Sequence, residues 1–204
     1  MSSVEYRTIV KYRLMILLFL VDEVCPVVRK ACLDKFGEHA VHCRELPAFK
    51  YIHDLVRDVL FDVFKRVGVS VIVKKEASVN FLTDPLEGRS TLRPADVLVY
   101  GWVGGKHACV DLIEVSPHVG LTTRDFTVGQ AALKAASSKV VKHERACPEN
   151  QYAFIAFAFD TFGFLATEVV DVLKRVQRVR HSNVVSTRSQ DVVFKRINFA
   201  IKKG

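Results

Sequence analysis

Two aspartates in the stretch RPADVLVYGWVGGKHACVDLIEVSP (93–117) have the type and spacing of a divalent-cation site. Asp96 and Asp111 stand on two β-branched segments joined by glycines, which is the pattern of a β-hairpin. Like charges on neighbouring strands repel, so an aspartate pair among apolar residues requires a compensating cation unless both side chains lie in solvent at strand ends. A hard cation such as Mg²⁺ or Mn²⁺ prefers carboxylate oxygens, and it lowers the pKa of a bound water. The pair therefore predicts metal-dependent phosphodiester hydrolysis.

The turn between the two strands decides how the aspartates meet. Strands are expected over 95–102 and 106–115, and alternate side chains of each strand share one face. A two-residue turn at 103–104 places the aspartates directly opposite each other, with Cβ atoms ~5 Å apart, whereas a turn at 104–105 makes them diagonal neighbours at up to ~7–8 Å. A three-residue loop would place them on different faces.

A lysine that orients or deprotonates the attacking water is expected as the third member of this site. The position two residues after Asp111 shares its face but holds Ile113. A helix is expected over 127–145, and at 100° per residue Lys139 lies in the middle of a face of small side chains. That face is formed by Ala131, Ala132, Ala135 and Ala136. Lys139 is therefore the candidate catalytic lysine, and the alternative is that it extends past the sheet edge into solvent.

A stretch rich in cysteine and histidine, CPVVRKACLDKFGEHAVHC (25–43), precedes the aspartates. The chain has five cysteines, and this odd number favours an intracellular metal site over a disulfide framework. Cysteine and histidine are the side chains that bind zinc tetrahedrally. The expected zinc ligands are Cys25, Cys32, His39 and Cys43. His42 is the alternative to Cys32.

The excess positive charge lies at the C-terminal end of the chain. The formal net charge is +8; residues 1–171 hold 21 basic and 21 acidic residues, whereas residues 172–204 hold 9 basic residues against Asp191 alone. A phosphate backbone attracts such a segment through counterion release, although a solvated charged face gives the same pattern. The expected nucleic-acid contacts are Lys174, Arg175, Arg178, Arg180 and, from the helix at 127–145, Lys142. The expected partner is DNA, with RNA as the alternative.

The rest of the sequence predicts the elements that position these residues. Apolar residues at helical spacing predict a helix over 51–67, which Gly68 ends. A β-branched strand follows over 69–81, and an aromatic, alternating strand is expected over 152–159. A last helix is expected over 167–180. The order of helix, three strands, helix, strand, helix predicts an α/β layer fold.

Four short motifs occur in a fixed order: RPADVLV, the DL of Asp111-Leu112, KVVKHERAC and FIAFAFDTFG. In this order they resemble the restriction-like endonuclease domain at the C-terminus of reverse-transcriptase polyproteins from non-LTR retroelements, especially plant sequences derived from them. That domain belongs to the PD-(D/E)xK nuclease superfamily. The resemblance covers roughly residues 25–165 and implies a restriction-endonuclease-like core of helix, three strands, helix, strand. It implies Asp96 and Asp111 as the metal-binding carboxylates, and Lys139 as a lysine that has moved from strand to helix.

The resemblance also implies a zinc knuckle before the nuclease core, which typically opens Cys-Pro-x-Cys. In this chain the second cysteine position holds Val28. The site has therefore either recruited Cys32 or lost a ligand. No Tyr-x-Asp-Asp polymerase motif occurs in the sequence. A catalytically inactive nucleic-acid-binding remnant of such a polyprotein is accordingly the alternative to an active nuclease.

These patterns predict four segments along the chain. They are an N-terminal segment (1–24), a zinc-knuckle-like Cys/His module (25–46), a restriction-endonuclease-like domain (47–182) and a basic C-terminal tail (183–204). The apolar run in the first segment is far shorter than the ~20 residues that a membrane span needs, so no membrane association is expected. An intracellular, nuclear location is expected for a chain of this kind.

Overall fold

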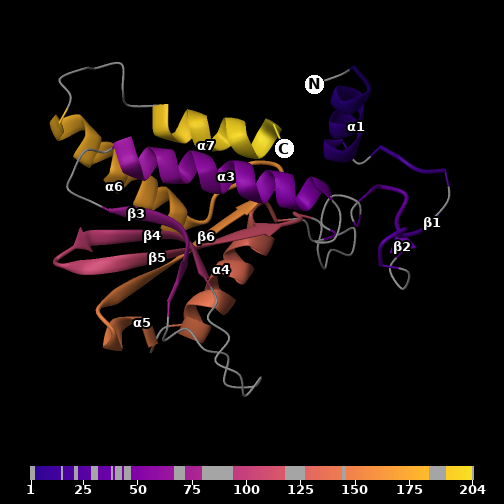
Figure 1. Cartoon of the computed structure of the whole chain (residues 1–204). Coiled ribbons are helices and arrows are strands. Elements are labelled where there is room, and N and C mark those ends of the chain that lie inside the picture. The colour runs from indigo at the N-terminus through magenta and orange to yellow at the C-terminus, as the bar shows by residue number, and fades with distance from the viewer. Residues whose placement is uncertain are drawn as a thin grey trace.

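The computed structural model describes residues 3–14, 16–20, 23–28, 32–37, 39, 43, 47–66, 72–79, 94–117, 127–143, 146–183 and 192–203. These residues form a four-stranded mixed sheet with helices on both faces, and a two-stranded sheet near the N-terminus (Figure 1). The expected α/β class is confirmed. The elements are α1 (Ser3–Arg13), β1 (Glu23–Val24), β2 (Cys32–Leu33), α3 (Pro47–Arg66), β3 (Val73–Ser78), β4 (Pro94–Val103), β5 (Lys106–Val115), α4 (Gln130–His143), α5 (Ala146–Glu149), β6 (Tyr152–Asp160), α6 (Thr167–Asn183) and α7 (Val192–Lys203). Of the described helices, none is both long and apolar enough to cross a membrane.

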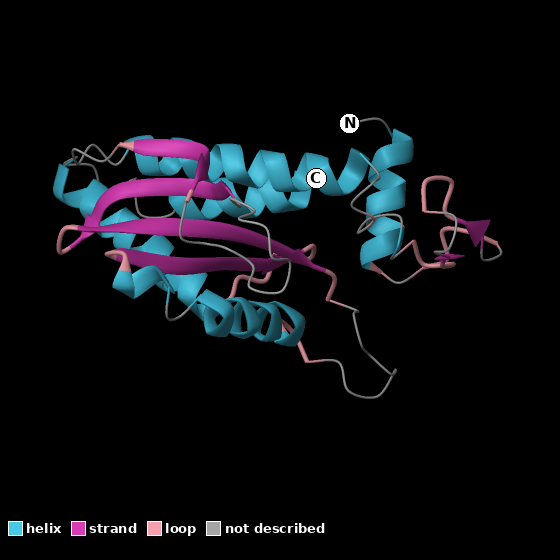
Figure 2. Cartoon of the chain, turned by 60° about the horizontal axis from the view of Figure 1, so that its bottom comes forward, coloured by secondary structure: helices cyan, strands magenta, loops and turns pink. Residues whose placement is uncertain are grey.

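The four-stranded sheet has the order β3-β4-β5-β6. The first three strands are antiparallel neighbours, and β6 runs parallel to β5. A parallel neighbour requires a crossover connection, and α4 lies on that crossover. Figure 2 shows the sheet with α4 on one side and α3 with α7 on the other. The element order from α3 to α6 agrees with the order predicted from the sequence, except for the short helix α5, which was not predicted.

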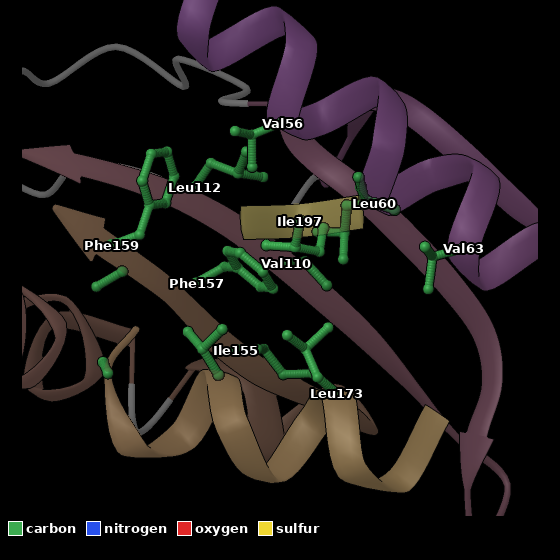
Figure 3. Close-up of a cluster of buried hydrophobic side chains, with 14 of the residues drawn as sticks. Val56, Leu60, Val63, Val110, Leu112, Ile155, Phe157, Phe159, Leu173 and Ile197 are labelled. Atoms are coloured by element: carbon green, nitrogen blue, oxygen red, sulfur yellow. The ribbon is translucent and has the colours of Figure 1, made fainter. Parts of the chain in front are cut away.

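The main core lies between the sheet and three helices, α3, α6 and α7 (Figure 3). Inward-facing side chains of β5 and β6 alternate along each strand, and they meet apolar stripes at helical spacing on the three helices. Residues drawn together in this core are Val56, Leu60, Val63, Val110, Leu112, Ile155, Phe157, Phe159, Leu173 and Ile197. The opposite face is covered by α4, whose Ala132 and Ala136 are fully or almost fully buried. Small side chains let this helix lie close to the sheet.

The basic C-terminal segment, expected as a tail over 183–204, contains the helix α7. The helix packs beside α3, and Arg196 forms an ion pair with Asp62 of α3 (Figure 1). Its buried residues follow one helical stripe: Val193, Ile197, Ala200 and Ile201. The charges of this segment indicated a tail, but an apolar stripe lies between them. The segment is therefore part of the core as well as a source of positive charge.

Truncating one buried side chain of α7 should destabilise the whole domain. Ile197 is fully buried, and Ile197→Ala is expected to lower the free energy of unfolding by about 2–4 kcal/mol through lost burial and a residual cavity. Phe199 of the same helix is 67% exposed, so Phe199→Ala should change it by less than about 0.5 kcal/mol. Urea titration followed by circular dichroism measures both values. Equal effects of the two substitutions would contradict the packing of α7 on the core.

Candidate active site

The hairpin that carries the aspartates turns at Gly104 and Gly105. Their φ angles are +56° and +79°, and Val103 pairs with Lys106 across the turn. Positive φ at both central residues is what a tight two-residue hairpin turn requires, and glycine adopts it without steric cost. The turn therefore lies at the second of the two positions considered from the sequence.

A bulge in β4 changes the register beyond the turn. Val103 pairs with Lys106, and the next pair is Val99 with Ala108. Four residues of β4 are therefore matched by two residues of β5. Gly101, at φ +66°, lies in this irregular stretch. From Val99 to Val97 the two strands pair in the register that a turn at 103–104 would give. Extending this register by one residue places Asp96 opposite Asp111. Without the bulge, a turn at 104–105 would make Asp96 and Asp111 diagonal neighbours. The bulge shifts the register, so the two aspartates lie directly opposite each other.

The Asp96 carboxylate links β4 to β5. Regular pairing of the two strands begins at Val97 and Val110. Two residues after Val110, the backbone N–H of Leu112 donates to Asp96 Oδ2 at 2.6 Å. This nitrogen is one peptide bond from Asp111, so the carboxylate of one aspartate lies against the backbone of the other. The side chain of Asp96 therefore joins the two strands just beyond their last paired residues.

Lys139 reaches the second aspartate from α4. Its Nζ lies 2.9 Å from Asp111 Oδ2, a separation typical of an ion pair, although the two groups are not aligned as a hydrogen bond. The side chains are 39% and 27% exposed, so water screens their attraction. Ala136, one turn before Lys139, is buried against the sheet. The alanine face therefore directs the lysine to the carboxylate, as the helical spacing predicted.

His53 is a neighbour of Asp96 that the sequence analysis did not identify. It belongs to α3, and its Nε2 lies 3.5 Å from Asp96 Oδ1. The hydrogen bond to Asp96 raises the pKa of His53, and burial opposes this shift. Each aspartate consequently has a cationic or potentially cationic partner. In the sequence, His53 is one of several polar residues on the helix, and only the tertiary fold distinguishes it.

Glu114 is the second residue that the sequence analysis missed. Both carboxyl oxygens are buried and have no hydrogen-bond partner among the described residues. Burial raises the pKa of Glu114 from 4.5 to about 8, and the nearby charge of His53 opposes the shift. At neutral pH most of Glu114 is therefore protonated. A neutral carboxylic acid lies three residues after Asp111 on the same strand.

Cys25, His39 and Cys43 form a group that could hold a metal ion. One ligand atom from each lies within 4.8 Å of the others, and both cysteines are buried. His39 Nε2 is buried without a hydrogen-bond partner among the described residues, which a coordinated metal would satisfy. The backbone of Cys32 pairs with Val24 in the small sheet, but its side chain lies outside the described residues, as does His42.

The turn after Cys25 keeps its sulfur in a polar environment. The backbone N–H of Val28 donates to Cys25 Sγ at 3.3 Å. This hydrogen bond is the main reason that the pKa of Cys25 falls to about 7, and burial opposes it. An N–H group that favours the thiolate also favours a metal-bound sulfur. The turn is present although position 28 lacks the second cysteine of the expected knuckle.

Of the five basic residues expected to contact nucleic acid, the four whose side chains are described do not form one surface. Lys174, Arg175 and Arg178 are exposed on α6, and the Arg175 guanidinium lies 5.5 Å from the ring centroid of Trp102. Lys142 is exposed on α4, which covers the opposite face of the sheet. The side chain of Arg180 lies outside the described residues.

Asp96 of β4, Asp111 of β5 and Lys139 of α4 are thus close together, and His53 lies beside Asp96 and near Glu114. The predicted basic contacts whose side chains are described are divided between the two faces of the sheet. Comparison with known protein families, with curated proteins and with solved structures finds no match to this chain.

Proposed function

We propose that this chain is a restriction-endonuclease-like domain that hydrolyses phosphodiester bonds of DNA with the help of a divalent cation. The observation that carries the proposal is the meeting of Asp96 of β4, Asp111 of β5 and Lys139 of α4. The order α3, β3, β4, β5, α4, β6, interrupted only by the short helix α5 among the described elements, supports it, because it is the core order that the resemblance of the four motifs implies.

Asp96 and Asp111 would hold the cation, with Mg²⁺ or Mn²⁺ as the expected metal. Two carboxylates suffice, because Mg²⁺ usually keeps several waters and takes only one or two protein carboxylates. Asp111 Oδ2 has no aligned hydrogen-bond donor among the described residues, and a cation at this oxygen would replace the Lys139 ammonium beside it. When bound, the metal would supply charge stabilisation and lower the pKa of a bound water.

The protein groups around the pair have separate roles in this proposal. The Leu112 N–H fixes the Asp96 carboxylate next to Asp111, so little entropy is lost when both carboxylates bind one ion. Lys139 would orient the attacking water or take its proton. His53 holds the second oxygen of Asp96 and acts as a positioning residue.

Plasmid nicking tests the proposal. Purified protein is incubated with supercoiled DNA and Mg²⁺ or Mn²⁺, beside Asp96→Asn, Asp111→Asn and the control Asp171→Asn, which changes an exposed carboxylate on α6. Each site variant should lose at least about 100-fold in rate, because several kcal/mol of charge stabilisation disappears. The control should retain full activity. Nicking that persists in Asp96→Asn or Asp111→Asn would show that this site does not cut DNA.

A catalytically inactive nucleic-acid-binding remnant is the second candidate function. The observation that favours it is that Lys139 and His53 already compensate both aspartates without a metal. This candidate predicts salt-sensitive DNA binding with no cleavage, and binding that Asp96→Asn and Asp111→Asn leave unchanged.

We also propose that the group of Cys25, His39 and Cys43 binds zinc. Two thiolates and an imidazole are the ligand types of structural zinc sites, and a water or Cys32 would complete a tetrahedron. Titration with Co²⁺ should give a thiolate-to-cobalt absorption band that Cys43→Ser abolishes. Cys147→Ala, which changes a buried cysteine in a different cluster, should leave the band intact. A band that survives Cys43→Ser would contradict the assignment.

Restoring the missing knuckle cysteine should strengthen this site. The Val28 N–H already donates to Cys25 Sγ, so the backbone at this position forms the turn that a Cys-Pro-x-Cys knuckle requires. Val28→Cys is expected to raise zinc affinity on the order of tenfold or more by adding a thiolate ligand. Competition with a chromogenic chelator measures the change, and an unchanged affinity would show that the turn does not face the metal.

A further inference from the structure

Three rings from three neighbouring strands lie in a line at the hairpin end of the sheet. Tyr100 of β4 and His107 of β5 have ring centroids 4.9 Å apart, and His107 and Tyr152 of β6 have centroids 5.1 Å apart. We call Tyr100, His107 and Tyr152 the ring row. From β3, Lys74 Nζ lies 5.5 Å from the ring centroid of Tyr100. Rings and lysine together extend across all four strands.

The β4 bulge holds the middle ring in place. The Gly101 N–H donates to His107 Nδ1 at 3.1 Å, so the imidazole accepts a backbone hydrogen that the irregular ladder leaves available. The row also rests on a buried cluster that includes Leu98, Cys109 and Cys147. Rings that are fixed before binding lose little conformational freedom when a ligand contacts them.

All three rings remain partly exposed, and Lys74, which lies over the Tyr100 ring, is exposed. Alternate residues of a strand share a face, so His107 and Asp111 belong to the same face of β5. They are four residues apart, which is about 13 Å, or the rise of roughly four stacked nucleotides. The row and the candidate active site therefore lie within reach of one short nucleic-acid segment.

We propose that the ring row binds a single-stranded nucleic-acid segment, with bases stacked on Tyr100 and Tyr152 and a phosphate held by Lys74. Aromatic side chains offer π-faces to any base, whereas a base inside a duplex already has both faces covered by its neighbours. Lys74 provides positive charge of the kind that a phosphate backbone attracts. In the proposed nuclease, the ring row would be the surface that positions the substrate. This role rests on the proposed function, whereas the binding of a single strand does not.

Fluorescence anisotropy in EDTA measures binding without cleavage. The probes are labelled oligothymidylate and oligouridylate of about 12 nucleotides, within the site sizes of single-strand-binding folds, and a duplex of the same length. The full chain should bind the single strands more tightly than the duplex. Whichever of the two single strands binds with the higher affinity shows whether the ligand is DNA or RNA. Because binding is measured without a metal, it does not depend on cleavage, so a failure of the nuclease proposal remains distinguishable from a failure of this one.

Substitutions that remove a ring but keep apolar bulk test the stacking. Tyr100→Leu and Tyr152→Leu should each weaken single-strand binding about tenfold, with roughly 5- to 100-fold as the range for a stacked base. Tyr100→Phe, which keeps the ring, and Tyr51→Leu, which changes an exposed tyrosine of α3, should stay within about twofold of the wild type. Circular dichroism verifies the fold of each variant.

Lys74→Gln provides a second test that does not alter the packing below the row. It should weaken binding and reduce the slope of log K against log salt by about one, because one phosphate contact is lost. Equal binding of duplex and single strand, or wild-type affinity in both leucine variants, would overturn the proposal. So would an unchanged salt slope in Lys74→Gln.

Discussion

Glu114→Gln is expected to stabilise the protein above pH 8 by about 2–5 kcal/mol, while it leaves stability near pH 4.5 almost unchanged. Burial raises the pKa of Glu114 from 4.5 to about 8. Because neither oxygen has a hydrogen-bond partner among the described residues, the ionised form has no local compensation beyond the charge of His53. Glutamine has nearly the same shape and carries no charge at any pH.

The direction of the pH dependence follows from proton binding. Between pH 4.5 and about 8 the native state keeps the Glu114 proton, whereas the unfolded chain has released it. The unfolded state therefore binds fewer protons, and wild-type stability falls as the pH rises through this window. Above about pH 8 both states are ionised, and the full penalty of the buried charge remains. Glu114→Gln should remove this part of the pH dependence.

Urea unfolding at several pH values, followed by the fluorescence of Trp102, measures the effect. Trp102 is the sole tryptophan, and its ring packs edge-on against Phe64 in the core. Glu149→Gln changes an exposed carboxylate and should retain the wild-type pH profile. A Glu114→Gln profile parallel to the wild type would show that Glu114 ionises freely in the folded protein.

The elements of this fold are readable from the sequence because most of them have strong periodicity. Helix α3 has a clean apolar stripe, and β6 alternates aromatic residues with alanines. Helix α7 was missed because its stripe of valine, isoleucine and alanine is interleaved with lysines and arginine, which were taken as a tail. A high density of charged residues does not indicate disorder when apolar residues recur between them at helical spacing.

The candidate site shows where local patterns reach their limit. Helical spacing was enough to direct Lys139 towards the sheet, since the alanine face is a property of one element. The register of Asp96 against Asp111 depends on a bulge, whose only local trace is Gly101. His53 becomes a neighbour of the site only when α3 packs on the sheet, so no spacing rule within one element could have identified it. Glu114 is on the same strand as Asp111, but its burial depends on the helices that pack on the sheet.

Lys139→Met separates the two roles that Lys139 can have beside Asp111. If the lysine orients or deprotonates the attacking water, its loss should reduce nicking by about 100- to 10,000-fold, as removal of a general base does. Its ammonium also competes with a metal ion for Asp111 Oδ2, 2.9 Å away. Loss of the ammonium should therefore leave the affinity for Mg²⁺ or Mn²⁺ unchanged or increase it. Methionine keeps the length and apolar character of the side chain, so packing against the sheet is retained.

Isothermal titration with Mn²⁺, beside a plasmid assay, measures the two quantities separately. Lys134→Met changes an exposed lysine of the same helix and should affect neither. Nicking at the wild-type rate in Lys139→Met would exclude the catalytic role. Loss of metal binding in the same variant would show instead that Lys139 holds Asp111 in place, because a competing cation can only weaken the binding of another. In the inactive remnant, nicking is absent throughout, and Lys139→Met should still bind Mn²⁺ at least as tightly as the wild type.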